Sequence, residues 1–112
     1  MQIFFLIIFI LLPSNLDITK MTQQHTLNSI VIYTTNYCPY CVKAKRLLEQ
    51  KGLKYSEINI EADATLRQEM VAKANGKKTV PQIFIGNLHV GGCDDLHELE
   101  RQGKLDEIIN AK

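Results

Sequence analysis

A Cys-Pro-Tyr-Cys motif at residues 38–41 stands between two stretches of different periodicity. Before it, residues 30–34 read Ile-Val-Ile-Tyr-Thr, a short β-branched run that is typical of a buried strand. After it, apolar residues recur at helical spacing as far as Leu48, and Gly52 is a suitable helix end. A Cys-x-x-Cys pair between a strand and a helix is typical of a redox motif. The sequence therefore predicts an α/β fold with reactive thiols at its first helix.

The position of Cys38 favours its thiolate form. The first N–H groups of a helix have no partner within the helix, and they carry the positive end of its dipole. Lys43 and Lys45 follow closely in the chain, and Pro39 suits a first helical turn because it has no N–H to donate. We therefore expect the pKa of Cys38 to lie below the roughly 8.5 of a free thiol. Cys38 would then be the nucleophile, and Cys41 the resolving thiol.

Size, charge and cysteine count narrow the class of protein. The chain has 112 residues, which suffices for one domain. It carries 13 Lys and Arg against 12 Asp and Glu, a net charge of +1, and this balance does not predict the basic face of a nucleic-acid-binding protein. Three cysteines do not make a disulfide framework; they suit a reducing compartment and a catalytic pair.

The N-terminal segment does not fit the rest of the chain. Residues 3–12 form an unbroken apolar run, shorter than the about 20 residues of a spanning helix. No Lys or Arg precedes the run, although a signal peptide normally has one there. Three interpretations of residues 1–20 stay open: an upstream extension of a protein that starts at Met21, an export or anchoring signal, or an appended helix. Residues 21–28 form a polar lead-in, and residues 29–112 the domain.

Periodicity and turn signals predict the remaining elements. After the first strand and helix, the expected elements are strand 54–60, helix 64–75, strands 82–85 and 88–90, and helices 94–102 and 105–110. The order is β-α-β-α-β-β-α-α. The first two strands must be parallel, with a right-handed crossover, and the last two form an antiparallel hairpin.

Three motifs in this order resemble the dithiol glutaredoxins, above all the small bacterial ones. They are Cys-Pro-Tyr-Cys at 38–41, Thr-Val-Pro-Gln-Ile-Phe-Ile at 79–85 and Gly-Gly-Cys-Asp-Asp-Leu at 91–96. The resemblance covers about residues 29–109. It implies a thioredoxin fold, in which helices flank a four-stranded mixed sheet. It also implies an enzyme that reduces protein disulfides and glutathione mixed disulfides, and that is recycled by glutathione and, through glutathione reductase, by NADPH. Glutathione would be a co-substrate, with no tightly bound cofactor and no metal.

The same resemblance implies a glutathione-binding surface. In this family the proline of Thr-Val-Pro follows a cis peptide bond, and the residue before it offers backbone groups to the cysteine of glutathione, as in strand addition. Backbone N–H groups at a helix start near Cys93 would bind the γ-glutamyl carboxylate, and Asp94 or Asp95 its ammonium group. Asp94 is also a candidate N-cap of this helix, and it can have both roles. The implied contacts are Tyr40, Gln68, Thr79, Val80, Pro81, Cys93, Asp94 and Asp95.

One position departs from the family pattern. The family usually has a lysine three residues before the first catalytic cysteine, where this chain has Thr35. Loss of one partly exposed ion pair weakens binding by roughly 0.5–1 kcal/mol. We therefore expect weaker glutathione binding and a less acidic Cys38 than is usual in the family.

Other interpretations of the cysteines stay open at this point. A structural zinc site would need Cys93 and a histidine, His89 or His97, beside the Cys-x-x-Cys pair; these histidines and His25 otherwise carry no motif. An iron–sulfur carrier would share a cluster between two subunits, and thioredoxin reductase would be a different reductant. The preferred interpretation predicts a cytoplasmic monomer whose partners are disulfide-bonded or glutathionylated proteins. The alternative is a protein that is exported or membrane-anchored through residues 1–20, and membrane contact would follow only if these residues are retained.

Overall fold

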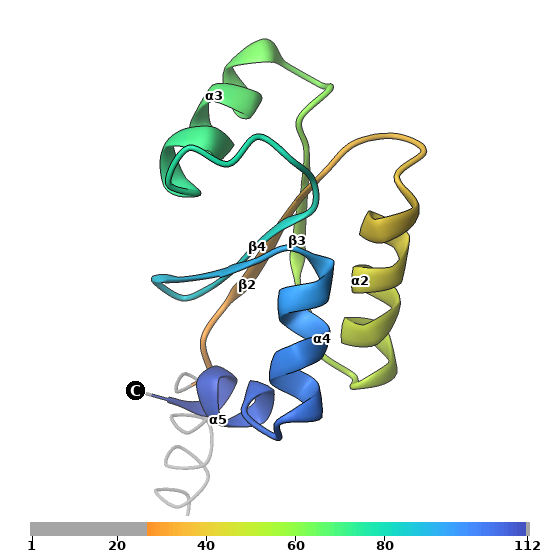
Figure 1. Ribbon diagram of the computed structural model, residues 1–112, viewed down its shortest axis with the longest axis vertical. Helices are drawn as coiled ribbons and strands as arrows, with labels where there is room; N and C mark the ends of the chain where they lie inside the picture. Colours follow the sequence, from red (N-terminus) through yellow and green to blue (C-terminus); the bar gives the residue numbers. More distant parts are fainter. Residues whose placement is uncertain (1–26, 112) are drawn as a thin grey trace, which may run out of the picture.

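The computed structural model describes residues 27–111, and these contain all the elements that the sequence predicts for the domain. In order they are β2 (Ile30–Thr34), α2 (Pro39–Gln50), β3 (Ser56–Asn59), α3 (Ala64–Lys73), β4 (Gln82–Ile85), β5 (Leu88–Gly91), α4 (Cys93–Arg101) and α5 (Leu105–Asn110) (Figure 1). Expectations about residues 1–26, which include the apolar run, Met21 and His25, lie outside the described residues. Within the described part, no helix is both long and apolar enough to cross a membrane.

The four strands form one mixed sheet in the order β3-β2-β4-β5. The central strand β2 is parallel to β3 and antiparallel to β4, and β4 is antiparallel to β5. The β-branched sequence of β2 suits this position, because Ile30 and Ile32 are buried on one face of the sheet and Tyr33 on the other. The predicted parallel pair, hairpin and four-stranded mixed sheet are confirmed.

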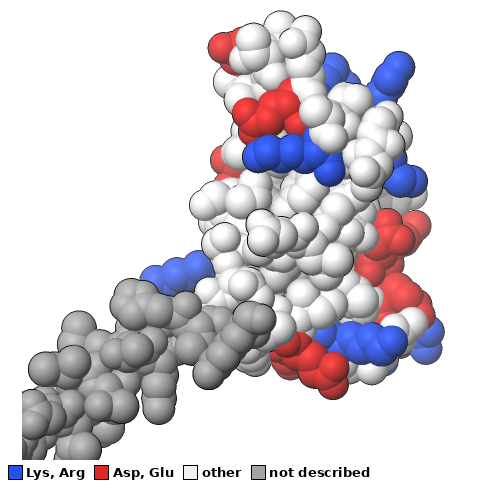
Figure 2. All heavy atoms as spheres, turned by 90° about the vertical axis from the view of Figure 1, so that its left-hand side faces the viewer, with Lys and Arg blue, Asp and Glu red and all other residues white. Residues whose placement is uncertain are grey.

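Helices cover the two faces of the sheet unequally. Helices α2 and α4 pack on one face, where Leu48 and Leu96 join the larger apolar core. Helix α3 lies on the other face and contributes Met70 to a smaller core around Tyr33 (Figure 1). Beside α3 this second face has a hollow of about 360 Å³, whose walls include Phe84. The side of the molecule seen in Figure 2 is largely free of charged side chains at its centre.

Two elements, β3 and α3, are shorter than the sequence predicts. β3 pairs with β2 from Ser56, which lies opposite Val31, to Asn59, which lies opposite Thr34 at the end of β2. α3 ends at Lys73, since Asn75 (φ 57°) and Gly76 (φ 89°) adopt left-handed backbone conformations that end a helix.

The start of α4 corrects the expectation that Asp94 caps this helix. The N-cap is Gly92, and Cys93 is the first helical residue. Asp95, three residues after the cap, accepts a hydrogen bond from the Gly92 N–H at 2.9 Å. The carboxylate that caps α4 is therefore that of Asp95, because only the third helical position reaches back to the N-cap backbone.

Candidate active site

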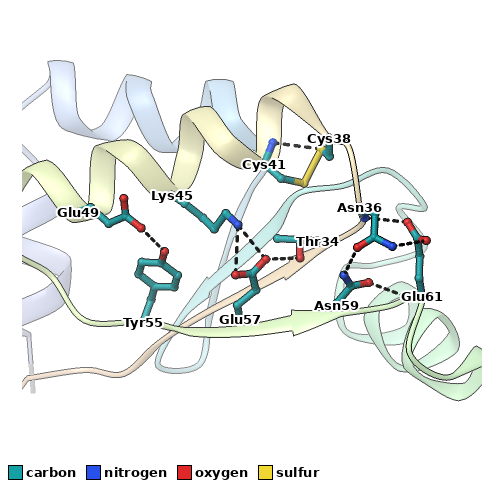
Figure 3. Close-up of polar contacts among 10 residues, drawn as sticks. All are labelled: Thr34, Asn36, Cys38, Cys41, Lys45, Glu49, Tyr55, Glu57, Asn59 and Glu61. Carbon is teal, nitrogen blue, oxygen red and sulfur yellow. Dashed lines mark hydrogen bonds and ion pairs between the residues drawn. A yellow bond between two sulfur atoms is a disulfide. The ribbon is translucent and has the colours of Figure 1, made fainter.

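Cys38 ends the loop after β2 and caps α2. Its backbone is extended (φ −109°, ψ 104°), and Pro39 follows at the start of the helix. Its Sγ accepts a hydrogen bond from the Cys41 backbone N–H at 3.1 Å, the type of contact that stabilises a thiolate (Figure 3). The two cysteines form a disulfide, with Cα atoms 5.1 Å apart, so the structure represents the oxidised pair. Cys41 is 1% exposed and Cys38 is partly exposed, so Cys38 presents the accessible sulfur.

The loop that leads into Cys38 is fastened by a network of hydrogen bonds (Figure 3). The Glu61 carboxylate accepts from the backbone N–H of Asn36 at 2.7 Å and from its side-chain Nδ2 at 3.0 Å. Asn59 donates to Asn36 Oδ1 at 2.8 Å, and the Glu61 N–H donates to Asn59 Oδ1 at 2.8 Å. The next residue, Tyr37, has a left-handed backbone (φ 55°) and is fully exposed. The network ties this loop to the end of β3, which fixes Cys38 relative to the sheet.

One of the two lysines that follow Cys38 closely in the chain, Lys45, forms an ion pair with a carboxylate on β3. Lys45 donates to the Glu57 carboxylate at 3.0 Å, and the buried Thr34 hydroxyl donates to the same group at 2.7 Å. The hydrogen bond from Thr34, followed by the bond and charge of Lys45, holds the pKa of Glu57 below its usual value. Lys45 is therefore paired with the Glu57 carboxylate. Because this anion balances its charge, Lys45 stabilises the Cys38 thiolate less than an unpaired lysine would.

A groove of about 210 Å³ lies beside the cysteine pair, between the loop before β4 and the start of α4. The Cys38 Sγ lies 4.0 Å from the carbonyl oxygen of Val80, a residue of the groove wall, and the Val80–Pro81 peptide bond is cis. The residues that line the groove are Tyr40, Lys77, Thr79, Val80, Pro81, Gln82, Gly92, Cys93, Asp94 and Asp95.

Seven of the eight residues expected at a glutathione surface thus lie together around one groove. The eighth, Gln68, is exposed on α3 and does not line it, so its contact with glutathione stays a prediction. The sequence interpretation did not single out Gln82 as a wall residue. Its signal was a polar side chain directly after Thr-Val-Pro, at the head of an apolar strand. Lys77 adds a cation to the same wall.

The α4 end of the groove offers backbone donors and one free carboxylate. Asp94 and Asp95 are both exposed, but the Asp95 carboxylate accepts a hydrogen bond from the Gly92 N–H. Cys93 is 4% exposed, and burial raises the pKa of its thiol. The nearby His97 Nδ1 lies 3.0 Å from the Cys93 carbonyl oxygen and 3.5 Å from its Sγ. Cys93 is therefore a protonated, buried thiol beside the groove, and it is the exposed Asp94 that can meet a cationic group.

The zinc alternative places all its ligands within residues 27–111. No group of three or more His, Cys, Asp and Glu side chains in this range is arranged to hold a metal ion. The sulfurs of Cys38 and Cys41 are bonded to each other, and Cys93 contacts His97.

Comparison with known proteins identifies the family. A family model described as glutaredoxin matches residues 30–90. A glutaredoxin of Pseudomonas aeruginosa is 57% identical over 82 residues, which cover 73% of this chain and 96% of that protein.

Solved structures agree with this match. The solution structure of a glutaredoxin from Brucella melitensis has a TM-score of 0.68 and 49% identity, and the match covers 76% of this chain and 91% of that one. The crystal structure of a buckwheat glutaredoxin–glutathione complex has a TM-score of 0.67 and 31% identity, with 87% and 92% covered. With its redox pair at the start of α2 and its sheet of four strands, the chain belongs to the glutaredoxin family.

Proposed function

We propose that this glutaredoxin is a glutathione-dependent thiol–disulfide oxidoreductase in which Cys38 is the nucleophile and the adjacent groove binds glutathione. The groove carries the proposal, because its Val80 wall lies 4.0 Å from the Cys38 sulfur. A glutathione sulfur bonded to Cys38 would therefore lie at the mouth of the groove. The buckwheat relative, solved with glutathione, supports the identity of the ligand.

The monothiol route uses Cys38 alone. The Cys38 thiolate attacks the glutathione sulfur of a mixed disulfide, and the thiolate of the substrate protein leaves and takes up a proton. Glutathione is then bonded to Cys38. The thiolate of a second glutathione attacks this bond, so that glutathione disulfide forms and the Cys38 thiolate is released. Because the Cys41 N–H donates to the Cys38 sulfur, this backbone contact favours Cys38 as the leaving group.

The dithiol route also uses Cys41. Cys38 attacks one sulfur of a protein disulfide and forms a mixed disulfide with it, while the S–S bond breaks and the other sulfur leaves as a thiolate that takes up a proton. Cys41 then attacks the Cys38 sulfur, the second protein thiolate leaves, and the Cys38–Cys41 bond that the structure contains is formed. Two glutathiones reduce this bond again, and glutathione reductase returns the resulting disulfide to glutathione with NADPH as electron donor.

We assign the two ends of glutathione to the two ends of the groove. At the α4 end, the backbone N–H groups at the helix start suit the γ-glutamyl carboxylate, and the exposed Asp94 suits its ammonium group. The cysteine of glutathione would pair with the Val80 backbone as an added strand. Its glycine carboxylate would then lie toward Lys77 and Thr79, with Tyr40 and Gln68 as further candidates.

The two aspartates give the first prediction. Asp94→Asn removes the charge that meets the ammonium group, so we expect KM for glutathione to rise roughly three- to fivefold with little change in Tm. Asp95→Ala removes the acceptor of the Gly92 N–H at the start of α4 and should instead lower stability by about 1 kcal/mol. Coupled kinetics and thermal unfolding of both variants measure the two effects. A higher KM for the Asp95 variant at unchanged Tm, with Asp94→Asn unaffected, would reverse the assignment.

The position of Thr35 gives the second prediction. Thr35→Lys adds a cation close to Cys38, where Lys45 is already paired with Glu57. We expect the variant to lower the pKa of the Cys38 thiol and to reduce KM for glutathione roughly two- to fivefold. Thiolate absorbance followed against pH in a Cys41→Ser background measures the pKa, and Thr35→Gln is the uncharged control. An unchanged pKa in the lysine variant would mean that position 35 does not act on the thiolate.

The proposed function itself is tested with the full chain in a coupled assay. A mixed disulfide of glutathione and a small thiol is the substrate, and NADPH loss is followed in the presence of glutathione and glutathione reductase. We expect turnover that depends on glutathione. The proposal would be contradicted if glutathione and glutathione reductase supported no turnover, whereas thioredoxin reductase without glutathione did.

We further propose that the enzyme works as a monomer in the cytoplasm on disulfide-bonded or glutathionylated proteins. The cysteine count, with a single redox pair and one buried thiol, suits a reducing compartment. Intact-mass measurement of the native protein tests this location. A mass that begins at Met21 or Thr22 excludes a membrane anchor in residues 1–20. Retention of those residues, with the protein recovered in the membrane fraction, would contradict the cytoplasmic assignment.

A further inference from the structure

One polar residue in the wall of the groove, Gln82, is buried. Gln82 is 1% exposed, at the first position of β4 and opposite Tyr33 of β2 in the sheet. It connects two regions, because it lines the groove beside Thr79 and also contacts His89, which borders the hollow on the α3 face of the sheet.

The hydrogen bonds of Gln82 can run in only one direction. Its Nε2 lies 3.0 Å from the carbonyl oxygen of Thr79 and 3.2 Å from the Thr79 hydroxyl. A carbonyl oxygen can only accept, so the amide NH₂ faces Thr79 and the amide oxygen faces His89. His89 Nε2 is 2.7 Å from that oxygen and must be the donor. The imidazole is held there by stacking on Phe84, with ring centroids 4.9 Å apart and planes at 26°.

Because Gln82 donates to Thr79, the Thr79 hydroxyl is left to act as a hydrogen-bond donor. Its oxygen receives the N–H of Gln82, so its own proton is available for another acceptor. Thr79 is exposed and lines the groove on the same chain segment as Lys77. The hydroxyl is thus a donor on the groove wall, next to a cation, and this combination suits a carboxylate.

We propose that His89 and Gln82 are positioning residues that fix the Thr79 hydroxyl as a donor to the glycine carboxylate of glutathione. The inference rests on the proposed function and deepens it, since it names the groups that orient one substrate contact. His89 donates to Gln82, Gln82 donates to Thr79, and Thr79 donates to the ligand. Neither His89 nor Gln82 touches the substrate carboxylate in this arrangement.

The test is a double-mutant cycle read as KM for glutathione and kcat in the coupled assay. Thr79→Val removes the hydroxyl, and Gln82→Met removes the amide that orients it without adding charge. Each variant should raise KM about fivefold and leave kcat at saturating glutathione within about twofold. Since both act on the same hydroxyl, the double variant should also show about a fivefold rise, and not the product of the two effects. Thr79→Ser, which keeps the hydroxyl, should retain the KM of the wild type.

His89 is tested separately. His89→Phe keeps an aromatic ring on Phe84 and removes the donor, so the amide of Gln82 can turn; we expect KM to rise about threefold. Gln50→Glu, an exposed substitution at the end of α2, serves as a control with unchanged kinetics.

The outcomes separate this inference from the proposed function. Wild-type protein that does not turn over with glutathione refutes the proposed function. Active wild type with an unchanged KM in Thr79→Val and Gln82→Met, or with effects that multiply in the double variant, refutes only the positioning role. Thr79 is exposed, so its variants should fold even if Gln82→Met lowers Tm. An unchanged KM in Thr79→Val alone therefore already overturns the inference.

Discussion

Replacement of Cys38 by serine is expected to reduce turnover of glutathione mixed disulfides by roughly three orders of magnitude, to the level of the uncatalysed exchange. A serine hydroxyl stays protonated at neutral pH, and neither the cap position nor the Cys41 N–H makes it a nucleophile for sulfur. The coupled assay with the full chain, glutathione reductase and NADPH measures the loss. The circular dichroism spectrum should be unchanged, because Cys38 is partly exposed and lies outside the two apolar cores.

Cys41→Ser is the matched control for this prediction. Cys41 is 1% exposed and takes part only in the dithiol route, so the variant should keep mixed-disulfide reduction within roughly threefold of wild type. It should lose most reduction of protein disulfides, since no resolving thiol remains. If Cys41→Ser abolished both reactions and Cys38→Ser retained one, the roles of nucleophile and resolving thiol would have to be exchanged.

Local patterns were sufficient to predict the elements and the position of the redox pair. The β-branched run of β2, the helical spacing after it and Pro39 together place Cys38 at a helix N-cap, and the structure confirms this. These signals are short in range, because they depend on the propensities and caps of neighbouring residues. The groove could be predicted for a different reason. Its two walls are motifs of the family, and the fold brings these motifs together.

The polar contacts around the pair could not be read from the sequence. Asn36 and Glu61 are 25 positions apart, and Lys45 and Glu57 are 12 apart, with no periodicity that links them. Each contact depends on the register of β2 and β3 and on how the connecting segments lie. The sequence therefore shows that Lys45 is near Cys38 along the chain, but not that the Glu57 carboxylate on β3 binds it.

The sequence could not show which of the two aspartates, Asp94 or Asp95, caps α4, and the reason is similar. Both lie in the first turn of the helix, and either one is a reasonable cap by residue type. The backbone of Gly91 and Gly92 decides which of them reaches the free N–H. Gly91 has φ 117°, and the Asp95 carboxylate lies against the position where a Cβ of residue 91 would be.

Gly91→Ala should for this reason be the most destabilising single change at the groove. The added methyl group would contact the Oδ2 and Cγ atoms of Asp95, and an L-residue is strained at this φ. Asp95 would have to move, so that its hydrogen bond with the Gly92 N–H at 2.9 Å is lost. We expect a loss of about 3 kcal/mol in the free energy of unfolding and a fall in Tm of more than about 10 °C. Urea unfolding followed by circular dichroism measures the loss.

Gly103→Ala separates backbone strain from the contact with Asp95. Gly103 also has a positive φ (75°), but no atom lies within 4 Å of the position of its added Cβ. Its substitution should therefore lower stability by only about 1 kcal/mol and leave KM for glutathione unchanged. In an Asp95→Ala background the two closest contacts at residue 91, with Oδ2 and Cγ of Asp95, are removed, so the loss caused by Gly91→Ala should shrink toward the value at Gly103. Equal losses at the two glycines in the wild-type background would mean that the contact with Asp95 adds nothing to the backbone strain at residue 91.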